Sequence, residues 1–269
     1  MKKRIFIAIV LALLIIWSVP KISSYFPGQQ DLPEPIAYEK IKEEVNVDST
    51  SSTPAELPTA TSTKPIVDPV INTTTPSTPV ITVTKEQINL AVPFQAQAPF
   101  GNWVEPYKEA CEEASLIMVD HYLAGTSLSK QQMQDEIDAQ ISWELKNWGG
   151  HFDLTLAQTA ELAQAMYNYQ TRIISDLTID KIKAELNAGN PVIVPAAGRE
   201  LDNPNFKQPG PLYHMLVIKG YLPGKFITND PGTRNGADYV YTEKVLLAAI
   251  RDWTGSAPDG PKVGLVLEK

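Results

Sequence analysis

The chain has little of the two residue types that most often mark metal and redox sites. Its 269 residues include one cysteine, Cys111, and three histidines, His121, His151 and His214. A single cysteine excludes an intramolecular disulfide framework, a cysteine-rich zinc site and an iron–sulfur cluster. The histidines are too scattered for a short metal-binding motif such as HExxH. The glycine-rich nucleotide-binding motifs and GxSxG are absent as well. The lone thiol is therefore either buried filler or a reactive group.

Positive charge is also scarce. The chain has 23 Lys and Arg against 31 Asp and Glu, which gives a net charge of −8. The sequence pI is near 5.0. Such a balance leaves no general cationic surface for a phosphate backbone, so nucleic acid is not an expected partner. Hydrophobic residues make up 43% of the chain, which is enough for one mid-sized core.

The first block of the chain has the pattern of an export segment. Lys2, Lys3 and Arg4 precede an apolar run, Ile5–Val19, which Pro20 ends. Its length permits either a cleaved signal or a short uncleaved anchor. Bulky residues at its end and the lack of an A-x-A cleavage pattern favour a signal-anchor over residues 1–26. The positively charged flank is then expected to stay in the cytoplasm, with the chain held in the cell membrane and everything after the apolar run outside it. If the leader is cleaved, the protein is secreted.

The second block, residues 27–87, is rich in Thr, Pro and Ser. Proline removes backbone donors, Ser and Thr compete for backbone hydrogen bonds, and little apolar area offsets the entropy of ordering. We expect a disordered linker. It serves either as a stalk that reaches into or across a cell wall or as a plain spacer, and both have the same polymer physics.

The third block, residues 88–269, is the part expected to fold. Apolar spacing predicts a helix that starts near residues 109–111 and ends before Gly125. Capping boxes open two more helices, near 130–141 and 156–168, and a further one is expected from Thr178 to Ala188. Five short β-branched or aromatic runs then follow: "PVIVPAA", "YHMLVIKGYL", "KFITND", "YVY" and "VGLVLE". Helices followed by antiparallel strands predict an α+β fold.

Cys111 is expected in the first turn of the first of these helices. Unpaired N–H groups and the helix dipole at that position favour a thiolate. A nucleophilic thiolate also needs a base, and the best candidate is His214, at the start of a predicted strand. If Leu222–Gly224 is a three-residue hairpin loop, Leu216 lies opposite Asp230, and Asp230 lies diagonal to His214 on one face. We prefer Asp230 to Asn229 as the partner of the imidazole, although a bulge would reverse this assignment.

Each of these residues also has an ordinary structural interpretation. A lone cysteine in an amphipathic helix is more often packed filler. A histidine at a strand start is more often a satisfied polar group, and an Asp before Pro-Gly is more often a turn former. The order Cys, His, Asp on a helix, a strand and the next strand is what favours a catalytic set.

Four segments of the third block resemble the C39-like peptidase family, which consists of papain-fold cysteine peptidases. These segments are "VPFQAQ" (92–97), "ACEEASLIMVDHYL" (110–123), "YHMLVIKGY" (213–221) and "ITNDPGT" (227–233). The resemblance covers essentially all of the third block and none of the first two. It implies a papain-like α+β fold.

The resemblance also implies roles for individual residues. Cys111, His214 and Asp230 fall on the family's catalytic triad. Gln97 falls on the glutamine that donates to the oxyanion hole, with Gln95 as the fallback. That amide and the backbone N–H of Cys111 would together hold a tetrahedral oxyanion, as acyl transfer requires.

The sequence departs from the family's pattern around the cysteine. Relatives often have Gly-Pro after the cysteine, whereas here Glu112 and Glu113 follow and raise the free energy of a neighbouring thiolate. An insert, "APFGNWVEPYKEA", lies before Cys111, and its Trp103 and Tyr107 form either a lid or ordinary packing. Three further residues form either a second cleft wall or packing: Trp143, Trp148 and His151.

The sequence therefore predicts an extracytoplasmic, membrane-tethered cysteine peptidase that hydrolyses an amide bond and needs no metal or organic cofactor. Its expected partners are a peptide or cell-wall substrate and the membrane. Two alternatives stay open: a papain-like peptidoglycan amidase or endopeptidase, and a catalytically silent module that binds a peptide or a wall component. The chain encodes no transporter ATPase, so the leader peptides cut by ATPase-fused relatives are not the expected substrate.

Overall fold

The computed structural model describes residues 32–43 and 85–269 of the chain. The predicted signal-anchor, residues 1–26, lies outside the described residues, as does most of the predicted linker. Within the described ranges, every helix is too short or too polar to cross a bilayer.

The predicted change from helices to strands is present. The helices are α3 (Cys111–Ala124), α4 (Lys130–Asn147), α5 (Leu156–Tyr167), α6 (Ile179–Asn187) and α7 (Glu243–Ala249), with 3-10 turns η1 (Tyr107–Glu109) and η2 (Gly198–Leu201). The strands are β1 (Ile88–Asn89), β2 (Gln170–Ile174), β3 (Val192–Ala197), β4 (Tyr213–Leu222), β5 (Lys225–Asn229), β6 (Tyr239–Thr242) and β7 (Gly264–Glu268). The α+β class is therefore confirmed.

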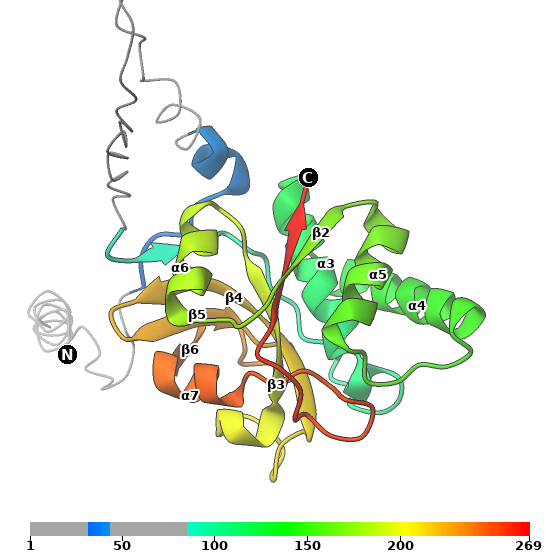
Figure 1. Cartoon of the computed structure of the whole chain (residues 1–269). Coiled ribbons are helices and arrows are strands. Elements are labelled where there is room, and N and C mark those ends of the chain that lie inside the picture. The colour runs from blue at the N-terminus through cyan, green and yellow to red at the C-terminus, as the bar shows by residue number, and fades with distance from the viewer. Residues whose placement is uncertain (1–31, 44–84) are drawn as a thin grey trace, which may run out of the picture. The chain divides into compact units, whose positions relative to one another are not determined.

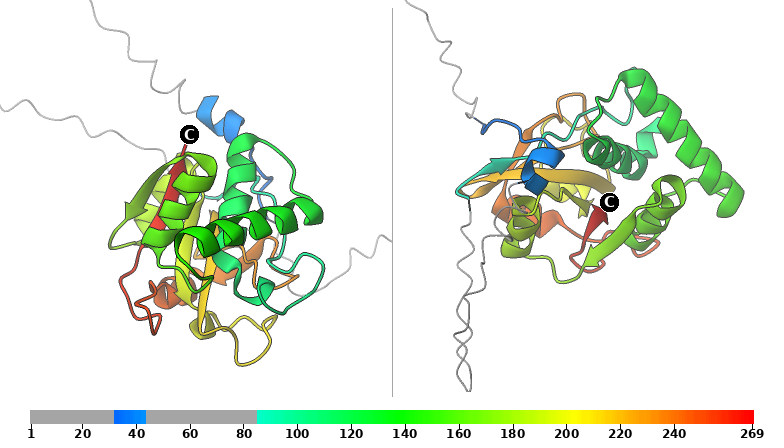
Figure 2. Two further views of the ribbon diagram at one scale, coloured as in Figure 1. Left: turned by 90° about the vertical axis from the view of Figure 1, so that its right-hand side faces the viewer. Right: turned by 90° about the horizontal axis from the view of Figure 1, so that it is seen from above.

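In the described part of the chain, all of these strands join one antiparallel sheet in the order β2-β7-β3-β4-β5-β6, with β1 also paired to β4. Figure 1 shows α3, α4 and α5 gathered at the right, and α6 and α7 at the left, where β5 and β6 also lie. The turned views in Figure 2 follow β7, in red, alongside β2. All of β4 is buried because α3 and α6 both contact it.

The predicted helix starts follow from side-chain capping. The side chains of Ser129 and Thr155 each accept a hydrogen bond from the N3 backbone N–H, and their own backbone N–H groups donate to the side chain of the N3 glutamine, so both capping boxes are confirmed. Gly125 ends α3 in the left-handed conformation at φ 69°. Helix α4 continues to Asn147 rather than ending near residue 141, because its buried face extends through Ile141 to Glu144.

The β4–β5 hairpin differs from the prediction in its loop length and in a bulge, and the two differences cancel in the register. Its loop has two residues rather than three, since Leu222 pairs with Lys225. A bulge at Lys219 then shifts the register, so that Val217 pairs with Asn229. Beyond the bulge the ladder has the predicted alignment, which sets Asp230 next after a residue paired to β4.

The predicted linker is wrong for residues 33–43, which pack against the folded domain. Ile36 forms a bridge with Leu90, and residues 38–43 are helical. Ile41 is only 1% exposed, and Lys42 donates to the carbonyl of Ala188 at 3.1 Å. Apolar side chains at helical spacing therefore offset the ordering entropy here in spite of the neighbouring prolines.

Candidate active site

Cys111 is the first residue of α3, as predicted. Its side chain is buried, with 5% exposure. Ala110, which precedes it, provides no side-chain cap, so the backbone N–H groups of the first turn have no capping oxygen from that residue. Sγ donates a hydrogen bond to Oε2 of Glu112 at 2.9 Å. The helix N-terminus therefore holds the thiol against a carboxyl group.

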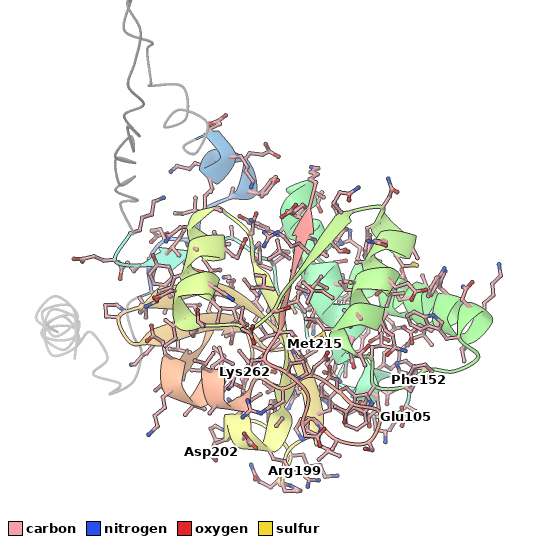
Figure 3. All side chains as sticks on the ribbon, in the orientation of Figure 1. Glu105, Phe152, Arg199, Asp202, Met215 and Lys262 are labelled. Carbon is pink, nitrogen blue, oxygen red and sulfur yellow. The ribbon has the colours of Figure 1, made fainter. Side chains whose placement is uncertain are left out.

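The surroundings of Cys111 favour the neutral thiol. Burial raises the pKa of Cys111 well above its usual value, and the negative charge of Glu112 raises it further. A backbone hydrogen bond from Met215 opposes this shift and lowers the pKa. Met215 follows His214 on β4, where Figure 3 labels it. The thiol thus contacts β4 next to the candidate base, His214. In the resting geometry, however, the thiol does not have the low pKa expected at a helix N-terminus.

His214 lies on β4 with its ring held from several sides. Nε2 is 2.8 Å from Oδ1 of Asp230, and both side chains are buried. The ring of Phe206 meets the imidazole edge to face at 5.3 Å. A Cβ at Gly232 would lie 2.8 Å from the imidazole Cε1, so glycine is needed at this close approach. The imidazole therefore has a single defined orientation.

Asp230 accepts four hydrogen bonds. Oδ1 receives those of His214 at 2.8 Å and the Gly232 backbone at 3.0 Å. Oδ2 receives those of Tyr241 at 2.6 Å and Asn203 at 3.1 Å. Burial alone would raise the pKa of Asp230, but attraction to His214 and these hydrogen bonds outweigh it and lower the pKa. Asp230 therefore accepts the Nε2 proton, which leaves Nδ1 as the basic nitrogen of a neutral imidazole.

Gln97 lies close to the segment that precedes Cys111, and its side-chain amide is already hydrogen-bonded. Its Nε2 donates to the carbonyls of Tyr107 and Lys108 at 3.0 and 2.9 Å. Its Oε1 is buried without a hydrogen-bond partner among the described residues. Both amide hydrogens thus hold η1, and neither is free for a substrate oxygen. Gln95, the fallback, donates instead to the carbonyl of Leu128.

Acidic side chains surround the start of α3. Glu112 and Glu113 are both 1% exposed. Oε1 of Glu112 accepts the backbone N–H of Leu154 at 3.0 Å. Burial, and then the charge of Glu113, raise the pKa of Glu112 well above its usual range. The same two causes raise the pKa of Glu144 to about 10. Glu113, Glu144 and His151 form a set of potential metal ligands.

The aromatic residues of the insert take no part in the His214–Asp230 pair. The Tyr107 hydroxyl donates to Asp138 on α4 at 2.9 Å, and Trp103 is partly exposed. Outside the insert, Trp143 and Trp148 pack edge to face at 4.9 Å, and the ring of Trp148 also lies 6.3 Å from that of Phe152.

A cavity of about 310 Å³ lies near residues that contact the sequence neighbours of Cys111 and His214, and none of the four candidate site residues lines it. It is lined by Phe152, Asp153, Thr155, Gln158, Trp253 and Gly255. Leu154, between two of these residues, donates to Glu112. Trp253 stacks on Tyr213, the neighbour of His214, at 5.2 Å. The cavity thus adjoins the loop next to Cys111 and the strand next to His214.

Two residues of the site have no signal in the sequence. Asn203 and Tyr241 both hold Oδ2 of Asp230, yet one lies in a loop and the other in a short strand. Neither belongs to a motif or to a spacing that marks it. Only the folded arrangement brings them to the carboxylate.

No curated protein matches the chain. Among solved structures, a protein from Bacillus anthracis named as a C39-like peptidase has 18% identity and a TM-score of 0.47, with 69% of this chain and 98% of that chain covered. The peptidase domain of Streptococcus ComA, a bi-functional ABC transporter involved in a quorum sensing pathway, has 16% identity and a TM-score of 0.34, with coverage of 60% and 93%.

The family models give the assignment. The model of the Peptidase_C39 like family matches residues 89–255, which is more than half of the chain. The matched range contains Cys111, His214 and Asp230. The chain therefore belongs to the Peptidase_C39 like family of papain-like cysteine peptidases.

Proposed function

We propose that this protein is an extracytoplasmic, membrane-tethered peptidase that cleaves peptide bonds with Cys111, His214 and Asp230. The observation that carries the proposal is the 2.8 Å contact between His214 and Asp230. It accompanies a cysteine at the start of α3 that contacts the backbone next to that histidine. A nucleophile, a base and a group that orients the base are the parts that acyl transfer to a thiol requires.

The first step transfers a proton and forms the acyl-enzyme. Nδ1 of His214 takes the proton of Cys111, and the thiolate attacks the carbonyl carbon of the substrate. Asp230 stabilises the imidazolium through Nε2. The imidazolium then gives its proton to the leaving amine as the C–N bond breaks. Because the resting thiol is bonded to Glu112, this proton transfer must first replace that hydrogen bond.

The second step consumes water. Nδ1 of His214 takes a proton from water, the hydroxide oxygen attacks the thioester, and the thiol leaves with that proton. The backbone N–H of Cys111 is the candidate donor to the oxyanion. Gln97 can be a second donor only if its amide gives up its hydrogen bonds to the carbonyls of η1. In the resting geometry Gln97 is therefore a positioning residue for the segment before Cys111.

The substrate proposal follows from the cavity beside the site. A volume of about 310 Å³ lined by Phe152 and Trp253 suits one apolar or aromatic side chain of an extended peptide. Tethering is proposed from the sequence alone, from the apolar run in residues 1–26 and the Thr/Pro/Ser-rich stretch that follows. Carbonate extraction of membranes tests the tether, because an anchored chain stays in the pellet.

A second candidate function, a binding module that does not cleave, is favoured by one observation. The thiol of Cys111 is buried, and its pKa is raised in the described arrangement. A protein that binds peptides without cleaving them needs only the fold and its binding cleft. Turnover and thiol chemistry separate the two candidates.

The decisive experiment measures hydrolysis of a peptide library by the full chain in detergent. Cys111→Ala is expected to lower turnover at least about 10³-fold, since the nucleophile is removed. His214→Gln is expected to have an effect of similar size. Circular dichroism melting shows whether each variant folds.

His121→Gln is the matched control. His121 is also a buried histidine held by a carboxylate, Glu136, at 2.9 Å, and it should retain turnover. Unchanged hydrolysis in Cys111→Ala would overturn the proposal. Binding of peptides without turnover in the wild type would favour the second candidate. Release of peptides from purified peptidoglycan, with none from the library, would assign the activity to wall cross-links.

A further inference from the structure

Two buried glutamates and a partly buried histidine meet behind the first turn of α3. Glu113 is the third residue of α3, Glu144 lies in the last turn of α4, and His151 follows α4 in the loop before α5. One donor atom from each lies within 4.8 Å of the other two. Phe152, the neighbour of His151, is labelled in Figure 3 and marks this loop. The chain thus brings three potential ligands together from a helix start, a helix end and a loop.

Within the described residues, the polar atoms of this cluster approach one another but make no hydrogen bond to a residue outside it. Glu144 is 0% exposed and Glu113 is 1% exposed. The four carboxylate oxygens and Nε2 of His151 have no hydrogen bond of acceptable geometry. Nε2 does approach Oε1 of Glu113 to 3.1 Å, as an ion pair. Buried groups of this kind are nearly always hydrogen-bonded or bound to a metal, because burial without a partner costs several kcal/mol.

The donor set suits a divalent transition metal. Two carboxylate oxygens and one imidazole nitrogen are ligands of zinc and of its neighbours in the first transition row. Ligands at about 2.0–2.2 Å from a common ion lie at most about 4.4 Å apart. The three candidate ligand atoms all lie within 4.8 Å of one another, and the Nε2 of His151 is 3.1 Å from Oε1 of Glu113, so these separations are close to that range.

A second cluster of the same composition provides the contrast. Asp120, His121 and Glu136 also lie within ligand distance of one another. Both nitrogens of His121 are hydrogen-bonded, to Glu136 at 2.9 Å and to Thr126 at 2.8 Å. Asp120 accepts the hydroxyl of Tyr169 at 2.9 Å. These atoms already have partners, so the observations point to the first cluster alone.

We propose that Glu113, Glu144 and His151 bind one divalent transition-metal ion of the zinc class. The ion joins the start of α3 to the end of α4 and to the loop after it. It holds that loop beside Glu112, which accepts the backbone of Leu154. The site is structural in this role, and it does not depend on whether the protein cleaves peptides.

The test is a titration of the chelator-stripped full chain with ZnCl₂ by isothermal calorimetry. It uses the Cys111→Ala chain as well as the wild type, so that the thiol is not a competing ligand. We expect one equivalent to bind in both. Glu144→Gln and His151→Gln should each weaken binding at least tenfold, and zinc should raise the melting temperature of the wild type.

Glu136→Gln is the matched control, because it removes a carboxylate from the partnered cluster, and it should leave zinc affinity unchanged. If Glu144→Gln fails to fold, His151→Gln and the visible spectrum of the Co²⁺ form still test the site. The proposal is overturned if the wild type takes up no zinc, or if Glu136→Gln loses affinity while His151→Gln keeps it.

Discussion

At the scale of single residues, Asp230 has the most consequential surroundings in the site. A carboxylate with no exposure receives four hydrogen bonds, one of them from an imidazole. These bonds exist in full only while the group is ionised. The folded pKa is lowered below the ordinary value, 3.8. The stabilisation is therefore complete above the unfolded pKa of about 3.9 and is lost as the pH falls through the lower, folded pKa.

Asp230→Asn should reduce the free energy of unfolding by about 2–4 kcal/mol at pH 7, because it removes the charge from a buried hydrogen-bonded pair. At pH values below the folded pKa the loss should shrink, since the wild-type carboxyl is then protonated too. Urea unfolding at pH 7 and at acid pH measures both values. Asp180→Asn, at an exposed position in the first turn of α6, is the control. Equal losses at both pH values would contradict the linkage.

Residue types with distinctive chemistry could be predicted from the sequence, whereas their secondary contacts could not. A lone cysteine at a helix start and a histidine at a strand start are visible as patterns. The two amide hydrogens of Gln97 point to backbone carbonyls because η1 folds back over them, and no sequence signal specifies that turn. The catalytic roles of Cys111, His214, Asp230 and Gln97 stay predictions.

At the scale of elements, helix starts were the most predictable features because they depend on local side-chain bonds. Ser129 and Thr155 act within three residues of themselves. The β4–β5 register depends instead on the bulge at Lys219, beside which β1 pairs. That position is set by a strand more than a hundred residues earlier. A local count therefore reached the right alignment only because the shorter loop compensated the bulge.

Gly220→Ala should separate β1 from β4. A Cβ at Gly220 would lie 2.3 Å from the carbonyl oxygen of Ile88, a backbone atom that cannot rotate away. We expect a loss of about 1–3 kcal/mol in the free energy of unfolding. Hydrogen exchange should also be faster at the amide of Leu90, which donates to the carbonyl of Lys219 at 2.8 Å.

Gly150→Ala is the control, because its nearest neighbour is the side chain of Phe152 at 3.2 Å, which can move. It should change both quantities far less. Unchanged exchange at Leu90 in Gly220→Ala would show that the close approach is not what limits the position of β1.

At the scale of the whole folded unit, residues 33–43 are the part whose folding the sequence did not predict. Pro33 and Pro35 lie at their start and the block around them is polar, so composition averaged over that block predicts a linker. The structure instead buries Ile41 and stacks Tyr38 edge to face on Tyr122 at 5.5 Å. The short helix at residues 38–43 buries enough apolar area to offset its ordering entropy, because α3 and the end of α6 already present an apolar surface to it.

Ile41→Ala should lower the free energy of unfolding by about 2–5 kcal/mol, as expected for a fully buried aliphatic side chain. A chain that begins at residue 85 should lose at least as much. Chemical denaturation measures both, with Glu39→Ala, at an exposed position of the same helix, as the control. If the shortened chain is as stable as the longer one, the segment does not belong to the cooperative unit.

The position of β7 has a consequence for biogenesis. Residues 264–268 lie between β2 and β3, so the sheet has a gap until they are in place. During synthesis, the edges of β2 and β3 that pair with β7 have no partner until residues 264–268 have emerged from the ribosome. A chain that stops before residue 264 therefore leaves β2 without a partner among the described strands and β3 paired only with β4, so this sheet is completed last.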